Sequence, residues 1–289
     1  MTPLVVIVGE TASGKTALSI ELAKRLGGEI ICADSWTVYK GFDIGTAKPT
    51  AEEQQGVPHH LLDVADPSEG FSAAVFQRMA KQKIEEIAAR GSLPIIVGGT
   101  GLYADSILYD YSFLPASDPA QREVLNQMSL DDLLQKAADM GLDTSQVDVR
   151  NKRRVIRLIE NNGQMPTRQP LRENTVVLGI RRPGAEMEQR IIQRIEAMID
   201  SGFVDEVAKL GAQYGWDCEA MKAPGYTALA QYINGTIGLD EAKQRTVRQH
   251  LQLAKKQRTW FKRNSSIQWV STDDSIEDIC ENVRHTLNK

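Results

Sequence analysis

The sequence predicts an α/β protein, with a parallel sheet flanked by helices, a small helical insertion domain and a helical C-terminal part. Short apolar runs rich in β-branched residues alternate with stretches whose apolar residues recur at helical spacing, which is typical of strands joined by crossover helices. A second observation is that the first run leads into a glycine-containing loop and then a helix over Ala17–Leu26. The predicted strands are Leu4–Val8, Gly28–Asp34, Pro58–Val64, Leu93–Gly98 and Thr175–Ile180.

The loop after the first predicted strand carries the strongest motif. It reads Gly9-Glu10-Thr11-Ala12-Ser13-Gly14-Lys15-Thr16 and matches the fixed positions of a phosphate-binding P-loop. Its glycines allow the backbone to wrap a phosphate, so that N–H groups and the positive helix end point inward. We expect Lys15 to reach the outer phosphate and the Thr16 hydroxyl to hold Mg²⁺. The motif predicts a P-loop NTPase-like core whose eight loop residues bind a di- or triphosphate; the alternative is a plain glycine turn.

Composition limits the class of protein. With 289 residues, 42% of them hydrophobic and 25% charged, the chain is long enough for one large or two modest domains with a core. The three cysteines form no close pair, which argues against a disulfide framework or a zinc ribbon. The sequence shows no segment of signal-peptide form and no apolar run of membrane-spanning length. We therefore expect a cytoplasmic protein with no membrane partner.

The pattern of residues divides the chain into three parts. Residues 1–114 form the predicted P-loop core, and 115–174 form a helical insertion with short pieces such as Leu130–Met140. Residues 175–289 return one strand to the sheet and are otherwise predicted to be helical. Their predicted helices are Ala185–Asp200, Phe203–Tyr214 and Ala242–Lys262.

Asp34 ends the second predicted strand and is the carboxylate placed most like a reactive group. Ligands of open α/β sheets bind outside the carboxyl ends of strands, so Asp34 should lie near the loop. The strand Leu93–Gly98 runs into glycines and Thr100, and lacks the terminal aspartate common in hydrolytic P-loop enzymes. This favours group transfer, with Asp34 as base or metal ligand. The alternative is a helix cap or a solvated strand end.

Two segments are strongly basic although the net charge of the chain is −4. The segment 150–157 carries five basic residues and no acidic one. Between Ala242 and Arg263 there are eight basic residues and no Asp or Glu. A solvated helix face is the simpler interpretation, but such faces usually mix both signs. The segments favour binding of a nucleic-acid backbone.

Together with these features, the sequence resembles a known family, the bacterial tRNA dimethylallyltransferases, or isopentenyl-tRNA transferases. Five blocks carry the resemblance: residues 9–16, 33–49, 59–67, 97–103 and 253–260. The second block, from Ala33-Asp34-Ser35 to Gly45-Thr46-Ala47-Lys48-Pro49, is far more specific than a P-loop.

The resemblance implies transfer of a dimethylallyl group from its diphosphate to N6 of adenosine 37 of tRNA, with Mg²⁺. The loop with Lys15 and Thr16 would hold the leaving diphosphate. Arg190 and Arg194, at i and i+4 of one helix, would form a second clamp on it. Asp34 would act as the general base. The target base would have to leave the anticodon-loop stack.

The resemblance also implies a tRNA-binding surface on a monomeric enzyme, with the insertion as a tRNA-binding domain. Lys255, Lys256 and Arg258 of the basic helix agree with this from charge alone. Departures from the family pattern are Glu10 in place of proline, Asn151 in place of aspartate, Thr227 in place of Arg or Lys, and His250-Leu251 in place of a Thr-Arg pair. The other implied tRNA-binding residues are Asp34, Ser35, Trp36, Thr37, Thr100, Arg122, Arg153, Arg154, Val155, Ile156, Arg157, Lys222, Ala223, Pro224, Gly225, Tyr226 and Thr227.

Three other functions use some of the same features. A small-molecule P-loop kinase would bind ATP in the loop but has no need for the basic helix. A prenyltransferase acting on free adenine nucleotides is disfavoured by the two basic segments. An RNA-binding module that has lost activity is disfavoured by the joint presence of Lys15, Thr16 and Asp34.

Overall fold

The computed structural model describes residues 1–115 and 118–287. The chain forms two compact units, Met1–Leu108 with Leu171–Lys289, and Tyr109–Pro170. The predicted insertion, 115–174, overlaps the second unit but has different first and last residues. Ala116, Ser117, Asn288 and Lys289, which belong to the predicted insertion and C-terminal part, lie outside the described residues.

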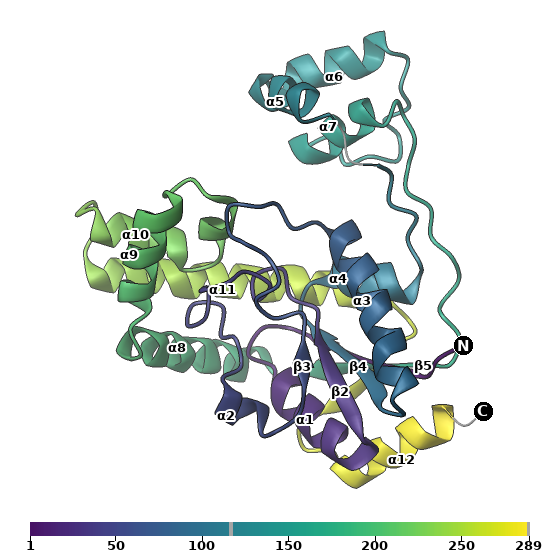
Figure 1. Cartoon of the computed structure of the whole chain (residues 1–289). Coiled ribbons are helices and arrows are strands. Elements are labelled where there is room, and N and C mark those ends of the chain that lie inside the picture. The colour runs from purple at the N-terminus through teal and green to yellow at the C-terminus, as the bar shows by residue number, and fades with distance from the viewer. Residues whose placement is uncertain (116–117, 288–289) are drawn as a thin grey trace. The chain divides into compact units, whose positions relative to one another are not determined.

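The larger unit is built on a parallel sheet (Figure 1). Within the described residues the sheet has six strands in the order β3-β2-β4-β1-β5-β6. Every neighbouring pair of them is parallel. The predicted fold class, a parallel sheet flanked by helices, is therefore confirmed. The strands are β1 Leu4–Gly9, β2 Gly28–Cys32, β3 His59–His60, β4 Leu93–Gly98, β5 Thr175–Arg181 and β6 Gln268–Ser271.

Helices cover both faces of the sheet because its strands are apolar on both faces. Alternate strand residues such as Val5 and Ile7 pack in one core with α1 and α12. Val6 and Ile96, which alternate with such residues, are also fully buried, and α3, α4 and α11 contact these strands. The helices of this unit are α1 Lys15–Leu26, α2 Ala51–Gln54, α3 Ala73–Ala89, α4 Gly101–Leu108, α8 Gly184–Asp200, α9 Phe203–Tyr214, α10 Tyr226–Ile233, α11 Leu239–Phe261 and α12 Ile276–Leu287, with a 3₁₀ turn at Glu219–Lys222.

Two predicted elements are wrong. The predicted strand Pro58–Val64 is reduced to His59–His60, because Leu61 and Asp63 adopt φ angles of 63° and 54°, which end an extended strand. The C-terminal part is not wholly helical, since Gln268–Ser271 pairs with β5 as an edge strand. There the Trp269 ring packs against the guanidinium of Arg181, whose carbon lies 4.7 Å from the ring centroid.

Glu206 on α9 fixes the loop between β2 and α2. Its carboxylate accepts hydrogen bonds from the backbone N–H groups of Asp43, Ile44 and Gly45, at 2.7 to 3.0 Å. It also accepts one from the Tyr226 hydroxyl, at 2.6 Å. The helical layer of α9 and α10 therefore supports a loop that follows the second strand of the sheet.

The smaller unit consists of three helices within its described residues, α5 Pro119–Gln127, α6 Leu130–Asp139 and α7 Lys152–Glu160. The predicted helix Leu130–Met140 corresponds to α6, and the basic segment 150–157 overlaps the start of α7 at Lys152. Apolar faces of all three helices form a separate core.

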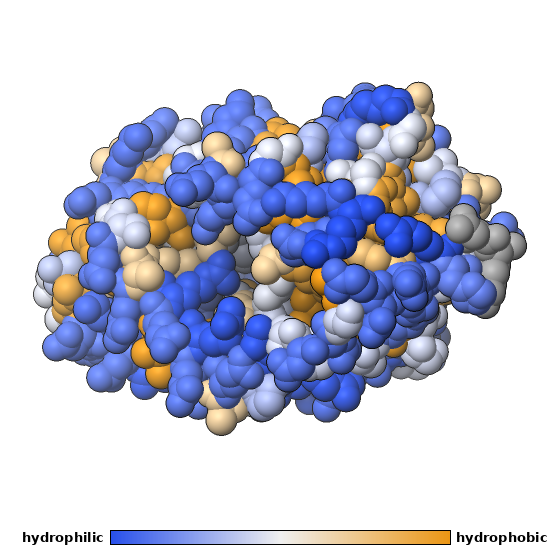
Figure 2. Space-filling model, turned by 90° about the horizontal axis from the view of Figure 1, so that it is seen from below, coloured by the Kyte–Doolittle hydropathy of each residue, from blue (hydrophilic) through white to orange (hydrophobic). Residues whose placement is uncertain are grey.

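No helix in the described part of the chain is both long and apolar enough to cross a membrane. In Figure 2, hydrophilic side chains cover most of the face shown.

Candidate active site

The glycine loop lies between β1, one of the two middle strands of the sheet, and the first helix. Strand β1 ends at Gly9, and α1 begins at Lys15. Gly14 precedes the helix with a φ of 104°, a conformation that glycine adopts without steric cost. A Cβ on Gly9 would lie only 3.1 Å from the Ile180 carbonyl oxygen, so β5 closes one side of the loop. The loop therefore presents the amino end of α1, where partial positive charge favours an anion.

Lys15, the first residue of α1, supplies the cation of the loop. Its Nζ donates a hydrogen bond to the Glu10 carbonyl oxygen at 2.6 Å. Burial lowers the pKa of the Lys15 ammonium to about 8. The Asp34 carboxylate opposes that shift, whereas the Arg194 guanidinium adds to it. Lys15, Asp34 and Arg194 therefore form one electrostatic group, although they come from three separate segments.

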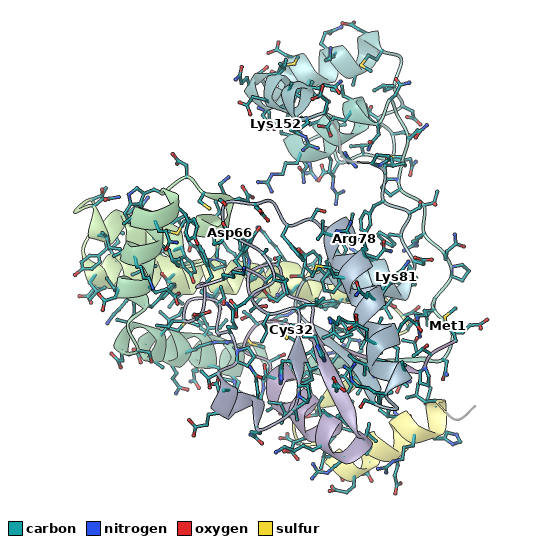
Figure 3. The ribbon with its side chains drawn as sticks, in the orientation of Figure 1. Met1, Cys32, Asp66, Arg78, Lys81 and Lys152 are labelled. Carbon is teal, nitrogen blue, oxygen red and sulfur yellow. The ribbon has the colours of Figure 1, made fainter. Side chains whose placement is uncertain are left out.

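Asp34 lies just beyond β2, whose end is marked by Cys32 in Figure 3. Its Oδ1 accepts the backbone N–H groups of Trp36 at 2.9 Å and of Thr37 at 3.4 Å. The loop that follows β4 is attached to this turn, because the Thr100 Oγ1 accepts a hydrogen bond from the Ser35 N–H at 3.0 Å. Strands β1, β4 and β2 are consecutive neighbours in the sheet, so their carboxyl ends bring the three loops together.

Helix α8 contributes the two predicted arginines. The Arg190 Nε donates to the Ala12 carbonyl oxygen at 3.0 Å, so this exposed residue contacts the loop directly. Burial lowers the pKa of Arg194, and attraction to Asp34 partly offsets the effect. Both arginines therefore face the site from one helix.

Two buried hydroxyls belong to the same site. Among the described residues, the side-chain oxygens that are buried without a hydrogen-bond partner are Ser13 Oγ and Thr37 Oγ1. Ser13 lies in the loop, and Thr37 follows Asp34 on the turn beside it. A buried polar atom without a hydrogen-bond partner destabilises the fold. A bound ligand or water can supply the missing hydrogen bond.

Sequence reasoning missed Arg182 and Gln257. The Arg182 Nε donates to the Ser13 carbonyl oxygen at 2.8 Å. The Gln257 Oε1 accepts the Thr11 N–H at 2.8 Å. The position of Arg182, directly after β5, was a usable signal, because it follows a parallel strand in the same way that Asp34 does. Gln257 carries no comparable local signal.

The residues implied in tRNA binding differ in exposure. Lys255, Lys256 and Thr227 are exposed, whereas Arg258 pairs with Glu10 through two contacts of 2.7 Å.

Lys222 pairs with Glu219, and the Gly225 N–H donates to Gln249. Pro224 is half-buried. Five side chains are buried, those of Val155, Ile156, Ala223, Tyr226 and Thr37, and the first four offer no surface to a ligand.

In the smaller unit, Arg122 and Arg157 both pair with the buried carboxylate of Glu160. Arg157 also donates to the carbonyl oxygens of Leu114 and Pro115 at 2.8 Å. These two arginines hold α5, α7 and the start of the unit together. Arg153 and Arg154 are the exposed cations of α7 among the implied positions.

The fold and the site define the class of this protein, an α/β protein with a glycine loop of P-loop sequence at the carboxyl end of a parallel sheet. The model of the IPP transferase family matches residues 37–264. The chain therefore belongs to the IPP transferase family, also known as the tRNA dimethylallyltransferases, and it is a prenyltransferase enzyme. This confirms the resemblance found in the sequence.

Relatives named tRNA dimethylallyltransferase cover nearly the whole chain. The protein of Anoxybacillus flavithermus is 44% identical over an alignment of 285 positions that covers 94% of this chain and 92% of the relative. That of Bacillus subtilis is 42% identical over an alignment of 290 positions that covers 95% of this chain and 92% of the relative.

Solved structures agree over the same length. The full-length tRNA isopentenylpyrophosphate transferase of Bacillus halodurans has a TM-score of 0.79 and 38% identity, and the match covers 100% of this chain and 97% of that chain. A eukaryotic dimethylallyltransferase acting on tRNA has a TM-score of 0.79 and 25% identity, with 99% and 78% covered.

Proposed function

We propose that this enzyme transfers the dimethylallyl group of dimethylallyl diphosphate to N6 of adenosine 37 of tRNA, beside the anticodon, and releases diphosphate. Membership of the family supports prenyl transfer to tRNA. The observation that carries the rest is the electrostatic group of Lys15, Asp34 and Arg194 at the loop. It combines cations for a leaving diphosphate with a carboxylate for an amine proton. A tRNA substrate would place the reaction in the cytoplasm.

The loop and the arginines would stabilise the leaving group. As the allylic C–O bond breaks, its electron pair moves to the diphosphate oxygen. Lys15, Arg190 and Arg194, together with the amino end of α1, supply positive charge where that negative charge grows. The Ser13 hydroxyl, buried without a partner in the described structure, is a further donor in the loop.

Asp34 would act on the nucleophile. The N6 amine attacks the allylic carbon, a C–N bond forms, and the proton lost from nitrogen passes to the Asp34 carboxylate. The backbone N–H groups of Trp36 and Thr37 hold one carboxylate oxygen, which fixes the orientation of the group. Because the base is stacked in the anticodon loop, it must be extruded to reach this position.

Mg²⁺ fits the oxygen donors at the loop. It prefers oxygen ligands and is usually held by one or two protein groups together with substrate phosphates and water. The Thr16 hydroxyl lies exposed in the first turn of α1, next to Lys15, and would hold the ion. When bound, Mg²⁺ would neutralise part of the diphosphate charge.

Exposed cations would bind the tRNA backbone. Lys255 and Lys256 are exposed on α11, and Arg153 and Arg154 are exposed on α7. Such contacts give affinity that falls steeply with salt. We propose that the enzyme acts as a monomer, because one chain supplies the loop, the carboxylate and both arginines.

The test is transfer to a defined acceptor. The protein is incubated with dimethylallyl diphosphate, Mg²⁺ and one of three acceptors: unmodified tRNA, AMP, or small molecules with ATP. Mass spectrometry of the nucleosides then locates the product. We expect only tRNA to gain the group, on a single adenosine. Modified AMP would indicate a free-nucleotide prenyltransferase, phosphoryl transfer would indicate a kinase, and tRNA binding without transfer would indicate an inactive RNA-binding module.

A further inference from the structure

Helix α11 holds the first half of the glycine loop at two adjacent points. The Arg258 guanidinium binds the Glu10 carboxylate through Nε and Nη2, and each lies 2.7 Å from a carboxylate oxygen. The preceding residue, Gln257, accepts the Thr11 N–H through Oε1 at 2.8 Å. One turn of α11 therefore binds both a loop side chain and the loop backbone.

The loop side of the ion pair and Gln257 are buried, whereas the Arg258 side chain is 42% exposed. Glu10 is 7% exposed and Gln257 is 8% exposed. A Cβ on Gly99 would lie 2.2 Å from the Gln257 Nε2, so Gln257 fills the space between the loops that follow β1 and β4. The Glu10 carboxylate raises the pKa of Arg258. A carboxylate buried to this degree is destabilised when its hydrogen-bonded cationic partner is removed.

The neighbouring cations of α11 differ from Arg258. Lys255 and Lys256 are exposed, and their ammonium groups are available to a polyanion. The Arg258 guanidinium is already engaged by two hydrogen bonds of fork geometry, the arrangement in which arginine recognises a carboxylate best.

We propose that Glu10, Gln257 and Arg258 are positioning residues, which hold the loop in the conformation that binds the diphosphate. Arg258 then acts on the diphosphate site through Glu10, and not by contact with tRNA. This inference rests on the proposed function and assigns α11 two roles, loop support at residues 257 and 258 and tRNA binding at Lys255 and Lys256.

The experiment compares Glu10→Gln, Arg258→Met and the double variant. Binding of inorganic pyrophosphate with Mg²⁺ is measured by calorimetry, and tRNA binding is measured separately over a range of salt concentrations. We expect each single variant to weaken pyrophosphate binding by about tenfold, and the double variant to be no weaker than either, because all three remove the same contact. The tRNA affinity and its salt dependence should stay within about twofold of the wild type.

Two further variants separate the explanations. Arg258→Lys keeps the charge but cannot form the two-pronged contact, so it should lose pyrophosphate affinity as Arg258→Met does. A phosphate contact to tRNA would survive that change. Glu241→Gln removes an exposed ion pair with Arg245 on the same helix, and it should leave pyrophosphate binding unchanged.

The inference is overturned if the Arg258 variants bind pyrophosphate as the wild type does, or if they lose tRNA affinity together with part of its salt dependence. Thermal melting of each variant identifies loss of folding, and Glu10→Gln, which keeps the size of the side chain, tests the contact from its other side. A wild type that transfers dimethylallyl groups while all variants bind pyrophosphate normally refutes this inference alone. A wild type that binds no pyrophosphate refutes the proposed function as well.

Discussion

At the scale of single residues, the protonation of Lys15 should control binding of the diphosphate. Burial lowers the pKa of Lys15 to about 8 in the free protein, and the protonated form is the one that attracts an anion. We expect the affinity for inorganic pyrophosphate, expressed relative to that of Lys15→Met at the same pH, to be constant below about pH 7 and to fall by up to about tenfold per pH unit above about pH 8, because one proton must then be taken up.

Calorimetric titrations across this pH range measure the effect. Lys15→Met is the reference, because the change in its affinity with pH reports the ionisation of pyrophosphate alone. A wild-type pH profile that parallels the profile of Lys15→Met would contradict the prediction.

Asp34 should matter for chemistry more than for binding. We expect Asp34→Asn to lower kcat by about 10²- to 10⁴-fold, the usual contribution of a general base. Its tRNA affinity should stay within about threefold, since the asparagine oxygen can still accept the backbone N–H groups of the turn. Asp143→Asn is a matched control, because the Asp143 carboxylate also accepts the N–H two residues further on, at 2.8 Å from Ser145. Equal kcat values for the two variants would show that Asp34 does not act as the general base.

At the scale of elements, the exposed lysines of α11 should supply salt-dependent affinity. Neutralising Lys255 or Lys256 to Met should weaken tRNA binding and reduce the slope of log affinity against log salt by about 1 for each. Gln252→Ala, at an exposed neutral position of the same helix, should change neither quantity. Filter binding at several salt concentrations measures both, and unchanged slopes would exclude backbone contacts at these residues.

The end of α3 is attached to two strands through Glu29. The Glu29 carboxylate of β2 binds Arg90, which caps α3, through two contacts of 2.7 Å, and it binds His60 of β3 at 2.7 Å. These contacts, the Arg90 hydrogen bond above all, lower the pKa of Glu29 to about 2. Because the folded-state pKa lies below the ordinary glutamate value of 4.5, the stabilisation is complete above that value and is lost as pH falls towards 2.

We therefore expect Glu29→Gln to lower the free energy of unfolding by about 2 kcal/mol at pH 7. This value is smaller than the pKa shift alone would give, because solvent screens the half-exposed Arg90. Urea unfolding at about pH 7, 4 and 3 measures the difference between the two proteins. That difference should shrink with falling pH, and a constant difference would show that packing, and not charge, is responsible.

At the scale of the whole molecule, the loop, Asp34 and both arginines belong to the larger unit alone. Leu108 and Arg172 meet where the chain leaves and re-enters this unit, since the Arg172 N–H donates to the Leu108 carbonyl oxygen at 2.7 Å. We expect a chain in which a short glycine-rich linker replaces 109–170 to bind pyrophosphate within about threefold of the wild type. Its tRNA affinity should fall, because the cations of α7 are removed. Loss of pyrophosphate binding in a folded variant would contradict this division of roles.

The secondary structure was predictable where a segment is long and its pattern uniform. The runs that became β1, β2, β4 and β5 are continuous and apolar, and the helices of the C-terminal part show clear amphipathic spacing. Strand β6 was missed because it has four residues of mixed polarity, and it is stabilised by its pairing with β5. The prediction for Pro58–Val64 failed because left-handed backbone at Leu61 and Asp63 is not visible in the apolar pattern.

The sequence by itself determined the position of the glycine loop between a strand and a helix, and the position of Asp34 at a strand end, because both depend on residues that are close along the chain. Only the tertiary structure decided that Arg258 binds Glu10, that Gln257 binds the backbone of Thr11, and that Tyr226 is buried against Glu206. The sequence shows charge and spacing, but the partner of a side chain depends on which elements the sheet order brings together. The basic pattern of α11 could therefore be identified from the sequence, while its division between loop support and an exposed cationic surface could not.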